Sequence, residues 1–135
     1  MTEDMNKFTL QTFVLIVEHD PELRKIMEIS LKQVGVKVTS VSRYPNALKI
    51  LEQKSPDIFV VDFDLRDGDP GRLIAAFRKN PKFNGGLVLV STANRLEDDW
   101  RREHKPDSVI YKPFDIRYLI RLIDLIAQKK EKELV

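Results

Sequence analysis

The sequence predicts an α/β fold in which five strands alternate with five helices. Short apolar runs recur along the chain, and most of them lack the polar alternation of half-buried strands. Each run is followed by a segment whose apolar residues are spaced three or four apart, as on one face of a helix. This alternation implies a parallel, doubly wound sheet that helices cover on both faces and that right-handed crossovers connect.

Five segments have the composition of strands. The first is apolar throughout, which predicts burial on both faces, and the second alternates like an edge strand. The third ends directly before an aspartate, and the last two are again short and mainly apolar. The predicted strands are Phe13–Val17, Val36–Val41, Ile58–Val61, Leu87–Ser91 and Ser108–Tyr111.

A helix is expected after each strand. The first, third and fifth helices each begin behind an aspartate that can cap the free amides of the first turn. The second is marked by apolar residues between positions 47 and 51. The fourth is weakly specified, because only Leu96 and Trp100 are apolar at helical spacing. The capping residues are Asp20, Asp69 and Asp115.

The composition indicates one globular domain. The chain has 135 residues, no cysteine and a net charge of +2, so neither a disulfide framework nor a direct nucleic-acid partner is expected. Its apolar runs are far shorter than the roughly 20 residues that span a bilayer, and its start is polar and acidic. We therefore expect a cytoplasmic protein without a membrane partner. The expected divisions are a flexible leader over 1–11, a domain over 12–128, and a C-terminal tail or the start of a linker over 129–135.

Polar residues follow four of the strands at the point where each strand ends. In a parallel sheet these ends lie at one edge, where ligands bind. A carboxylate there can accept a phosphoryl group, and an ammonium and a hydroxyl can hold it after transfer. The residues are Glu18 and His19, Asp62 and Asp64, Ser91 and Thr92, and Lys112.

Four motifs resemble the receiver domain of two-component response regulators. They are "VLIVEHDPELR", "PDIFVVDFDLRDGDPG", "VLVSTA" and "VIYKPF", and the resemblance extends over about residues 12–128. It implies a flavodoxin-like sheet with the strand order 2-1-3-4-5. It also implies a signalling domain that takes a phosphoryl group from a sensor histidine kinase or a phosphotransfer protein.

The resemblance gives each strand-end residue a role. Asp62 is the implied phosphoacceptor, Thr92 the hydroxyl that follows the phosphoryl group, and Lys112 the cation that binds its oxygens, with a cis bond to Pro113. Glu18, Asp62 and the main-chain carbonyl of Asp64 are the implied ligands of Mg²⁺. Phosphorylation is expected to change the face formed by helix 4, strand 5 and helix 5. That face is the candidate surface for an output protein, still unidentified, or for a homodimer.

Two departures from the family pattern affect these expectations. His19 replaces the acid that normally contacts the cation, and Mg²⁺ prefers oxygen ligands, so we expect a weakened magnesium site. Three interpretations of His19 stay open: a partly exposed loop residue, a positive partner for the neighbouring acids, or a ligand for a softer metal. Val109 occupies a position where many members carry an aromatic residue that turns inward on activation.

Parts of the sequence are compatible with two other functions. The departures at His19 and Val109 favour a pseudo-receiver, which binds partners without phosphate. The stretch "VVDFDLRDG" superficially matches phosphatases of the haloacid dehalogenase type, with Asp62 as nucleophile and Asp64 as acid/base. Such enzymes need a later acidic metal motif at a strand end, and none follows here. We therefore expect a protein that is not an enzyme.

Overall fold

The fold was analysed in a computed structural model, which describes residues 12–134. The expected leader over 1–11 lies outside the described residues. The strands are β1 (Phe13–Val17), β2 (Lys37–Val41), β3 (Ile58–Asp62), β4 (Leu87–Thr92) and β5 (Ser108–Tyr111). The helices are α1 (Pro21–Gln33), α2 (Tyr44–Gln53), α3 (Pro70–Lys79), α4 (Asp98–His104) and α5 (Ile116–Leu134).

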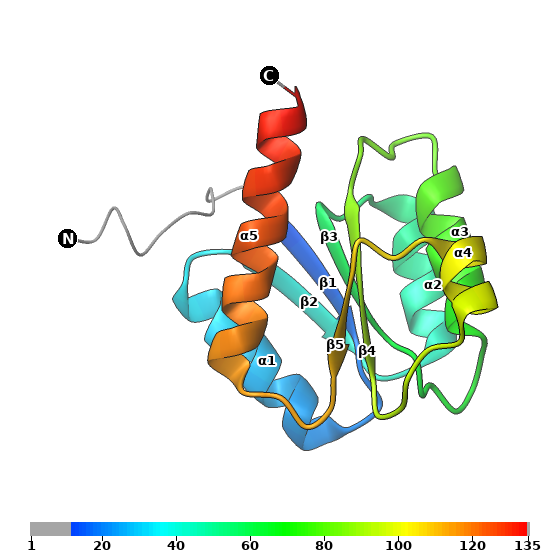
Figure 1. Cartoon of the computed structure of the whole chain (residues 1–135), viewed down its shortest axis with the longest axis horizontal. Coiled ribbons are helices and arrows are strands. Elements are labelled where there is room, and N and C mark those ends of the chain that lie inside the picture. Colours follow the sequence, from blue (N-terminus) through cyan, green and yellow to red (C-terminus); the bar gives the residue numbers. More distant parts are fainter. Residues whose placement is uncertain (1–11, 135) are drawn as a thin grey trace.

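The five strands form one parallel sheet in the order β2-β1-β3-β4-β5. Helices α1 and α5 cover one face, and α2, α3 and α4 cover the other (Figure 1). The predicted α/β class, the strand order and the edge position of β2 are confirmed. The chain folds this way because β1, β3 and β4 are apolar on both faces and must be covered twice.

Side chains from each strand alternate between two cores. In β1, Val14 and Ile16 pack toward α1 and α5, whereas Leu15 and Val17 pack toward α2, α3 and α4. The same alternation in β3 directs Phe59 and Val61 toward the second group of helices. It places the end of β3 between the two cores, where a polar side chain can reach the sheet edge.

The three predicted helix caps are confirmed. The carboxylates of Asp20, Asp69 and Asp115 accept hydrogen bonds from backbone amides two residues later, at 3.0, 2.8 and 2.8 Å respectively. A side-chain oxygen at this position satisfies one of the amides that have no partner inside the helix. These caps fix where the chain turns into a helix after β1, the β3 loop and β5.

The structure differs from the sequence expectations at two helices. Helix α5 does not stop at residue 128 but continues to Leu134. Residues 129–134 consist of Lys, Glu and Leu, which all favour helix, and nothing in them breaks the hydrogen-bond ladder. Helix α4 begins only at Asp98, so the buried Leu96 lies before it and Trp100 is the single apolar side chain within it.

Candidate functional site

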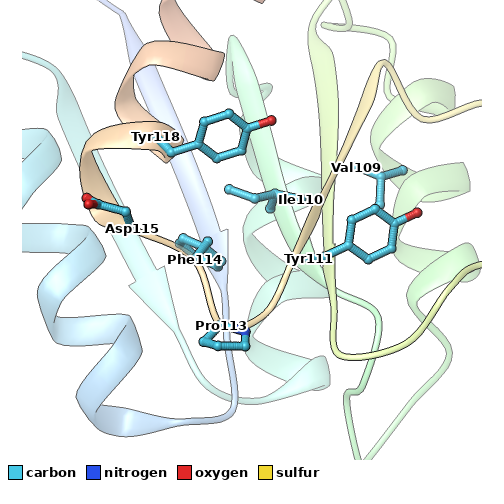
Figure 2. Close-up of a pocket in the computed structure, with 7 residues that line it drawn as sticks. All are labelled: Val109, Ile110, Tyr111, Pro113, Phe114, Asp115 and Tyr118. Carbon is cyan, nitrogen blue, oxygen red and sulfur yellow. The ribbon is translucent and has the colours of Figure 1, made fainter.

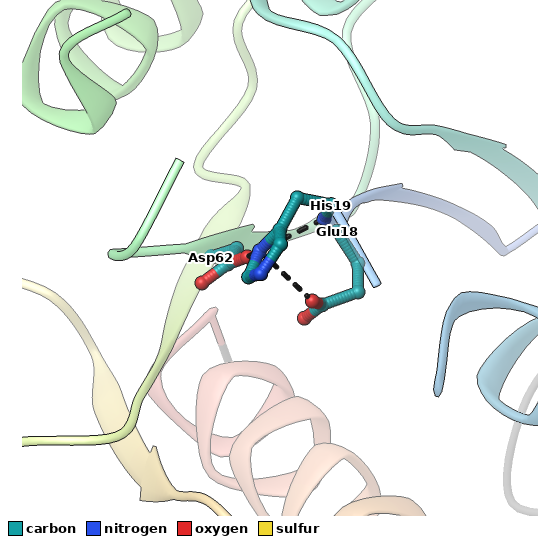
Figure 3. A group of neighbouring side chains, drawn as sticks. All are labelled: Glu18, His19 and Asp62. Carbon is teal, nitrogen blue, oxygen red and sulfur yellow. Dashed lines mark hydrogen bonds and ion pairs between the residues drawn. The ribbon is translucent and has the colours of Figure 1, made fainter. Parts of the chain in front are cut away.

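The carboxyl edge of the sheet brings together a cluster of four side chains from three segments. Glu18 and His19 follow β1, Asp62 ends β3, and Lys112 follows β5. The pairing of Val17 with Val61 sets Glu18 and Asp62 side by side, and both are fully buried. Figure 3 shows the imidazole of His19 next to the carboxylates of Glu18 and Asp62.

The two oxygens of Asp62 have different partners. Oδ1 accepts hydrogen bonds from Lys112 Nζ at 3.0 Å and from the Asp64 amide at 2.9 Å. Oδ2 is in hydrogen-bond contact with His19 Nδ1 and lies 3.4 Å from the His19 amide. The carboxylate is therefore held in one orientation by partners on both sides.

Glu18 is the second buried acid of the cluster. Its Oε2 accepts hydrogen bonds from the Asp20 amide and from Lys112 Nζ, each at 3.1 Å. Its Oε1 also lies 3.1 Å from Lys112 Nζ, but has no hydrogen bond among the described residues. Arg24 Nη1 donates to the Glu18 carbonyl at 3.0 Å and steadies the end of β1. The sequence analysis missed Arg24, whose only signal was its place one helical turn after the Asp20 cap.

Burial and neighbouring charges move the pKa values of this cluster in different directions. Burial and the charge of Asp62 raise the pKa of Glu18. Burial opposes ionisation of Asp62 too, but hydrogen bonds from His19, the Asp64 amide and Lys112 outweigh it and lower the pKa of Asp62. Burial likewise opposes the charge of Lys112, yet its bonds to Asp62 and Glu18 raise the pKa of Lys112. Asp62 is thus the more acidic of the two buried acids, and Lys112 is its counter-charge.

Thr92 and Asp64 lie beside the cluster but contact the loop after β4. The buried Thr92 hydroxyl donates to the Asn94 carbonyl at 2.8 Å and accepts from the Asn94 amide at 3.1 Å. The Asp64 carboxylate accepts a hydrogen bond from the Ala93 amide at 3.0 Å. The side chain of Asp64 is therefore engaged away from Asp62. That its carbonyl is a cation ligand stays a prediction.

The structure bears on the three interpretations of His19. Its side chain is 28% exposed, which agrees with a partly exposed loop position. However, Nδ1 contacts Asp62 and lies 3.4 Å from Glu18 Oε2, so the ring also partners both acids. The third interpretation, a metal ligand, fits the same contacts, because one atom each from Glu18, His19 and Asp62 lie within 4.8 Å of one another.

These residues fit a divalent cation, and they supply two carboxylates and one imidazole as donors. Two buried carboxylates supply hard oxygen ligands, and Glu18 Oε1 has no hydrogen bond that a cation would have to break. The third donor is an imidazole nitrogen, which suits transition metals better than Mg²⁺. The set therefore supplies donors that suit a divalent ion.

The bond between Lys112 and Pro113 is cis, as the family resemblance implied. Lys112 Nζ is directed back over the sheet edge, where it lies within 3.1 Å of oxygens of both Glu18 and Asp62. Its side chain is 15% exposed. Four strand-end residues predicted to converge thus form one cluster, in which His19 and Lys112 each contact both Glu18 and Asp62.

Comparison with known proteins agrees with this geometry. The model of the response regulator receiver domain family matches residues 14–124. The chain belongs to that family. An uncharacterized 14.6 kDa protein of Leptolyngbya boryana is 30% identical over 115 residues, which cover 84% of this chain and 88% of that protein. The chain spans about half the length of the transcriptional regulators that it also matches.

Solved receiver domains share the fold. One from Methanospirillum hungatei has a TM-score of 0.81 at 21% identity, covering 91% of this chain and 98% of that one. The receiver domain of sensor histidine kinase PA1611 from Pseudomonas aeruginosa has a TM-score of 0.74 at 23% identity, covering 87% and 98%. In that protein a magnesium ion is coordinated in the active-site cleft.

Family membership defines the class of function. Receiver domains accept phosphoryl groups in two-component signalling, bind Mg²⁺ in their acidic site, and act as signalling domains rather than enzymes. They work with histidine kinases or phosphotransfer proteins and with output domains. This receiver domain is therefore a phosphoryl-accepting signalling domain, and the pseudo-receiver alternative is not favoured. Within residues 12–134, no helix combines the length and the apolar character that a membrane crossing requires.

Proposed function

We propose that Asp62 accepts a phosphoryl group from the phosphohistidine of a sensor histidine kinase or a phosphotransfer protein. The observation that carries this proposal is the environment of Asp62 at the end of β3. Its carboxylate is buried, its pKa is lowered, and Lys112 Nζ lies 3.0 Å from Oδ1. The ionised carboxylate can attack phosphorus, and the neighbouring ammonium can stabilise the negative charge of the transferred phosphoryl group.

The transfer is a displacement at phosphorus. An Asp62 oxygen forms a bond to phosphorus while the bond between phosphorus and the donor's histidine nitrogen breaks, and that nitrogen leaves with the electron pair. Lys112 then exchanges part of its interaction with the carboxylate for the phosphoryl oxygens, which carry close to two negative charges. A bound Mg²⁺ would neutralise further charge on the transferred group.

We also propose that the domain does not turn over phosphate esters and that it acts in the cytoplasm.

Thr92 is the proposed switch hydroxyl. Its side chain is buried, and both of its hydrogen bonds go to the backbone of Asn94. If the hydroxyl turns to a phosphoryl group on Asp62, Asn94 loses these bonds and the loop before α4 can move. Phosphorylation would thereby shift an equilibrium between two arrangements of the loop rather than create a new fold.

His19 is proposed to weaken the magnesium site without removing it. Glu18 and Asp62 are retained as oxygen ligands, and the carbonyl of Asp64 is the third proposed ligand. An imidazole at position 19 supplies one fewer negative charge than a carboxylate, and Mg²⁺ binds nitrogen less readily than oxygen. The contact between His19 Nδ1 and Asp62 Oδ2 must also be broken before that oxygen can bind an ion.

The face formed by α4, β5 and α5 is the proposed partner surface. Tyr111 and Tyr118 are 45% and 52% exposed and offer apolar area to a partner. They border a pocket on this face (Figure 2), lined by Val109, Ile110, Tyr111, Pro113, Phe114, Asp115 and Tyr118. We propose that an output protein or a second copy of this domain binds here after phosphorylation. Sedimentation with and without a phosphodonor distinguishes the two.

Intact-mass spectrometry tests the proposed phosphoacceptor. The domain is incubated with acetyl phosphate and excess Mg²⁺, and should gain the mass of one phosphoryl group. Asp62→Asn should abolish the gain. Asp67→Asn is the matched control, because it removes a carboxylate of the same loop that bonds to the Tyr44 amide, and it should retain the gain. Labelling of Asp62→Asn, or no labelling of the wild type, would overturn the proposal.

A further inference from the structure

The only tryptophan of the chain contacts the residue that follows the proposed phosphoacceptor. The rings of Phe63 and Trp100 meet edge to face, with 5.0 Å between their centroids and 87° between their planes. Edge-to-face pairs are a favourable arrangement of aromatic rings and bury a large apolar area. The pair connects the end of β3 to α4, two segments separated by 36 positions in the sequence.

Phe63 is fixed relative to Asp62 by its backbone. Its amide donates to the Ser91 carbonyl at 2.7 Å, which continues the pairing of β3 with β4 by one residue. The next amide, of Asp64, donates to Asp62 Oδ1 at 2.9 Å. The Phe63 ring continues the alternation of Phe59 and Val61 and packs on the α2, α3 and α4 side of the sheet. A change at the Asp62 carboxylate therefore acts on a backbone that carries the Phe63 ring.

Helix α4 has few other attachments to the domain. None of its seven residues is fully buried, and Trp100 is its single apolar side chain. Trp100 also packs against His104, with 4.5 Å between ring centroids and 43° between ring planes. The helix end is held by α3: the guanidinium of Arg78 donates to the carbonyls of His104 and Lys105.

Helices α3 and α4 also pack closely where the His104 ring approaches the backbone of Gly71. A side chain added at Gly71, the second residue of α3, would place its Cβ 2.5 Å from the imidazole. The aromatic and polar contacts of Trp100, His104 and Arg78 thus form one continuous connection from Phe63 through α4 to α3. Figure 1 shows α4 beside α3 on this side of the sheet.

We propose that the contact between Phe63 and Trp100 couples phosphorylation of Asp62 to the position of α4. Both are positioning residues, which act through the backbone of Asp62 and touch no phosphoryl group. Val109, on the same side of the sheet, has no ring that could rotate inward, so Trp100 supplies an aromatic connection from a different element. The inference rests on the proposed role of Asp62.

Trp100 provides its own readout. Since it is the only tryptophan, its emission reports the surroundings of one side chain, Trp100, which include the Phe63 ring. Acetyl phosphate with Mg²⁺ should change the emission of the wild type with the same time course as the gain in mass. Asp62→Asn should show neither change.

Two matched substitutions separate coupling from general loss of packing. Phe63→Leu removes the ring that meets Trp100, and should keep phosphorylation while reducing the change in emission several-fold. Phe83→Leu removes a ring from another edge-to-face pair, with Phe77 at 5.1 Å, which shares no ring with the contacts of Phe63, Trp100 and His104. It should leave the change intact. Hydrogen exchange of α4 amides provides a second readout, which should respond to phosphorylation in Phe83→Leu but not in Phe63→Leu.

The outcomes distinguish this inference from the proposed function. Phosphoryl mass on the wild type without any change in Trp100 emission or α4 exchange overturns the coupling and leaves the role of Asp62 intact. Equal changes of Trp100 emission and of α4 exchange in Phe63→Leu and Phe83→Leu would also overturn the coupling and leave the role of Asp62 intact. No gain in mass on the wild type overturns the role of Asp62, and the coupling with it.

Discussion

The two sides of the Asp62 carboxylate differ in how closely they follow the receiver family. On the Oδ1 side, Lys112 and the Asp64 amide hold the oxygen at 3.0 and 2.9 Å, as expected of a group that handles phosphate. On the Oδ2 side, His19 stands where the family usually has a second acid. The Oδ1 side thus has the partners that the proposed phosphoryl transfer needs, whereas the Oδ2 side offers the proposed cation site an imidazole in place of a carboxylate.

The two sides also differ electrostatically. Lys112 is a permanent cation whose pKa is raised by its bonds to Asp62 and Glu18, although burial opposes its charge. His19 is more exposed, at 28% against 15% for Lys112, and adds no negative charge. A site with three carboxylates and one lysine has more negative than positive charge, which attracts a cation. In this site only Glu18 and Asp62 supply carboxylates, so the negative charge is smaller, and we infer that Mg²⁺ is attracted less strongly.

Removing the charge of Lys112 should have the largest effect. Lys112→Met keeps the apolar stem but leaves two buried carboxylates without their cation, which should lower the free energy of unfolding by about 3 kcal/mol at pH 7 in chelator. Denaturant unfolding measures it. Lys79→Met, at an exposed lysine, is the control and should stay within about 0.5 kcal/mol of the wild type. Equal losses in the two variants would contradict the central role of Lys112.

A carboxylate at position 19 should have an intermediate effect on stability. In chelator, His19→Asp loses the contact with Asp62 and adds a third acid beside Glu18 and Asp62, which should cost about 1–2 kcal/mol. His19→Asn removes the same ring without adding charge, and should cost less. If the two variants are equally stable without divalent cations, the cluster does not sense charge at position 19, and our account of the Oδ2 side is wrong.

The pH dependence of Glu18 should be the smallest effect, because Lys112 and the Asp20 amide partly offset its burial. Its folded pKa is raised, so folding favours the protonated form. In chelator, the stability of the wild type relative to Glu18→Gln should therefore rise as pH falls from 7 through the folded pKa. It should level off below the unfolded value near 4.3. Thermal unfolding at a series of pH values measures it, and a relative stability that falls with acid would contradict the raised pKa.

The sequence predicted most of the fold because its signals are local. The apolar run Phe13–Val17 and the caps Asp20, Asp69 and Asp115 depend on neighbours within a few residues, and all appear as expected. The approach of Glu18 to Asp62 followed from parallel topology, because β1 and β3 are neighbours in the sheet. Lys112 follows β5, which β4 separates from β3, and it reaches Asp62 through its long side chain.

The features that the sequence did not reveal depend on packing between distant segments. Nothing near Trp100 indicates that its ring meets Phe63, and nothing near Arg78 indicates that it holds the end of α4. The hydrogen bonds between the Thr92 hydroxyl and the backbone of Asn94 were likewise not predicted. Side-chain rotamers and contacts between distant segments decide these features, and no periodicity of the sequence records them.

The dependence of phosphorylation on Mg²⁺ concentration tests the central claim most directly. Phosphoryl mass on Asp62 is followed with acetyl phosphate for the wild type and for His19→Asp. We predict similar maximal labelling, with the wild type needing about tenfold more Mg²⁺ for half-saturation, a difference of about 1.4 kcal/mol in cation binding. Coincident curves would contradict the claim that His19 weakens the cation site, and no labelling at saturating Mg²⁺ would contradict the claim that Asp62 is the phosphoacceptor.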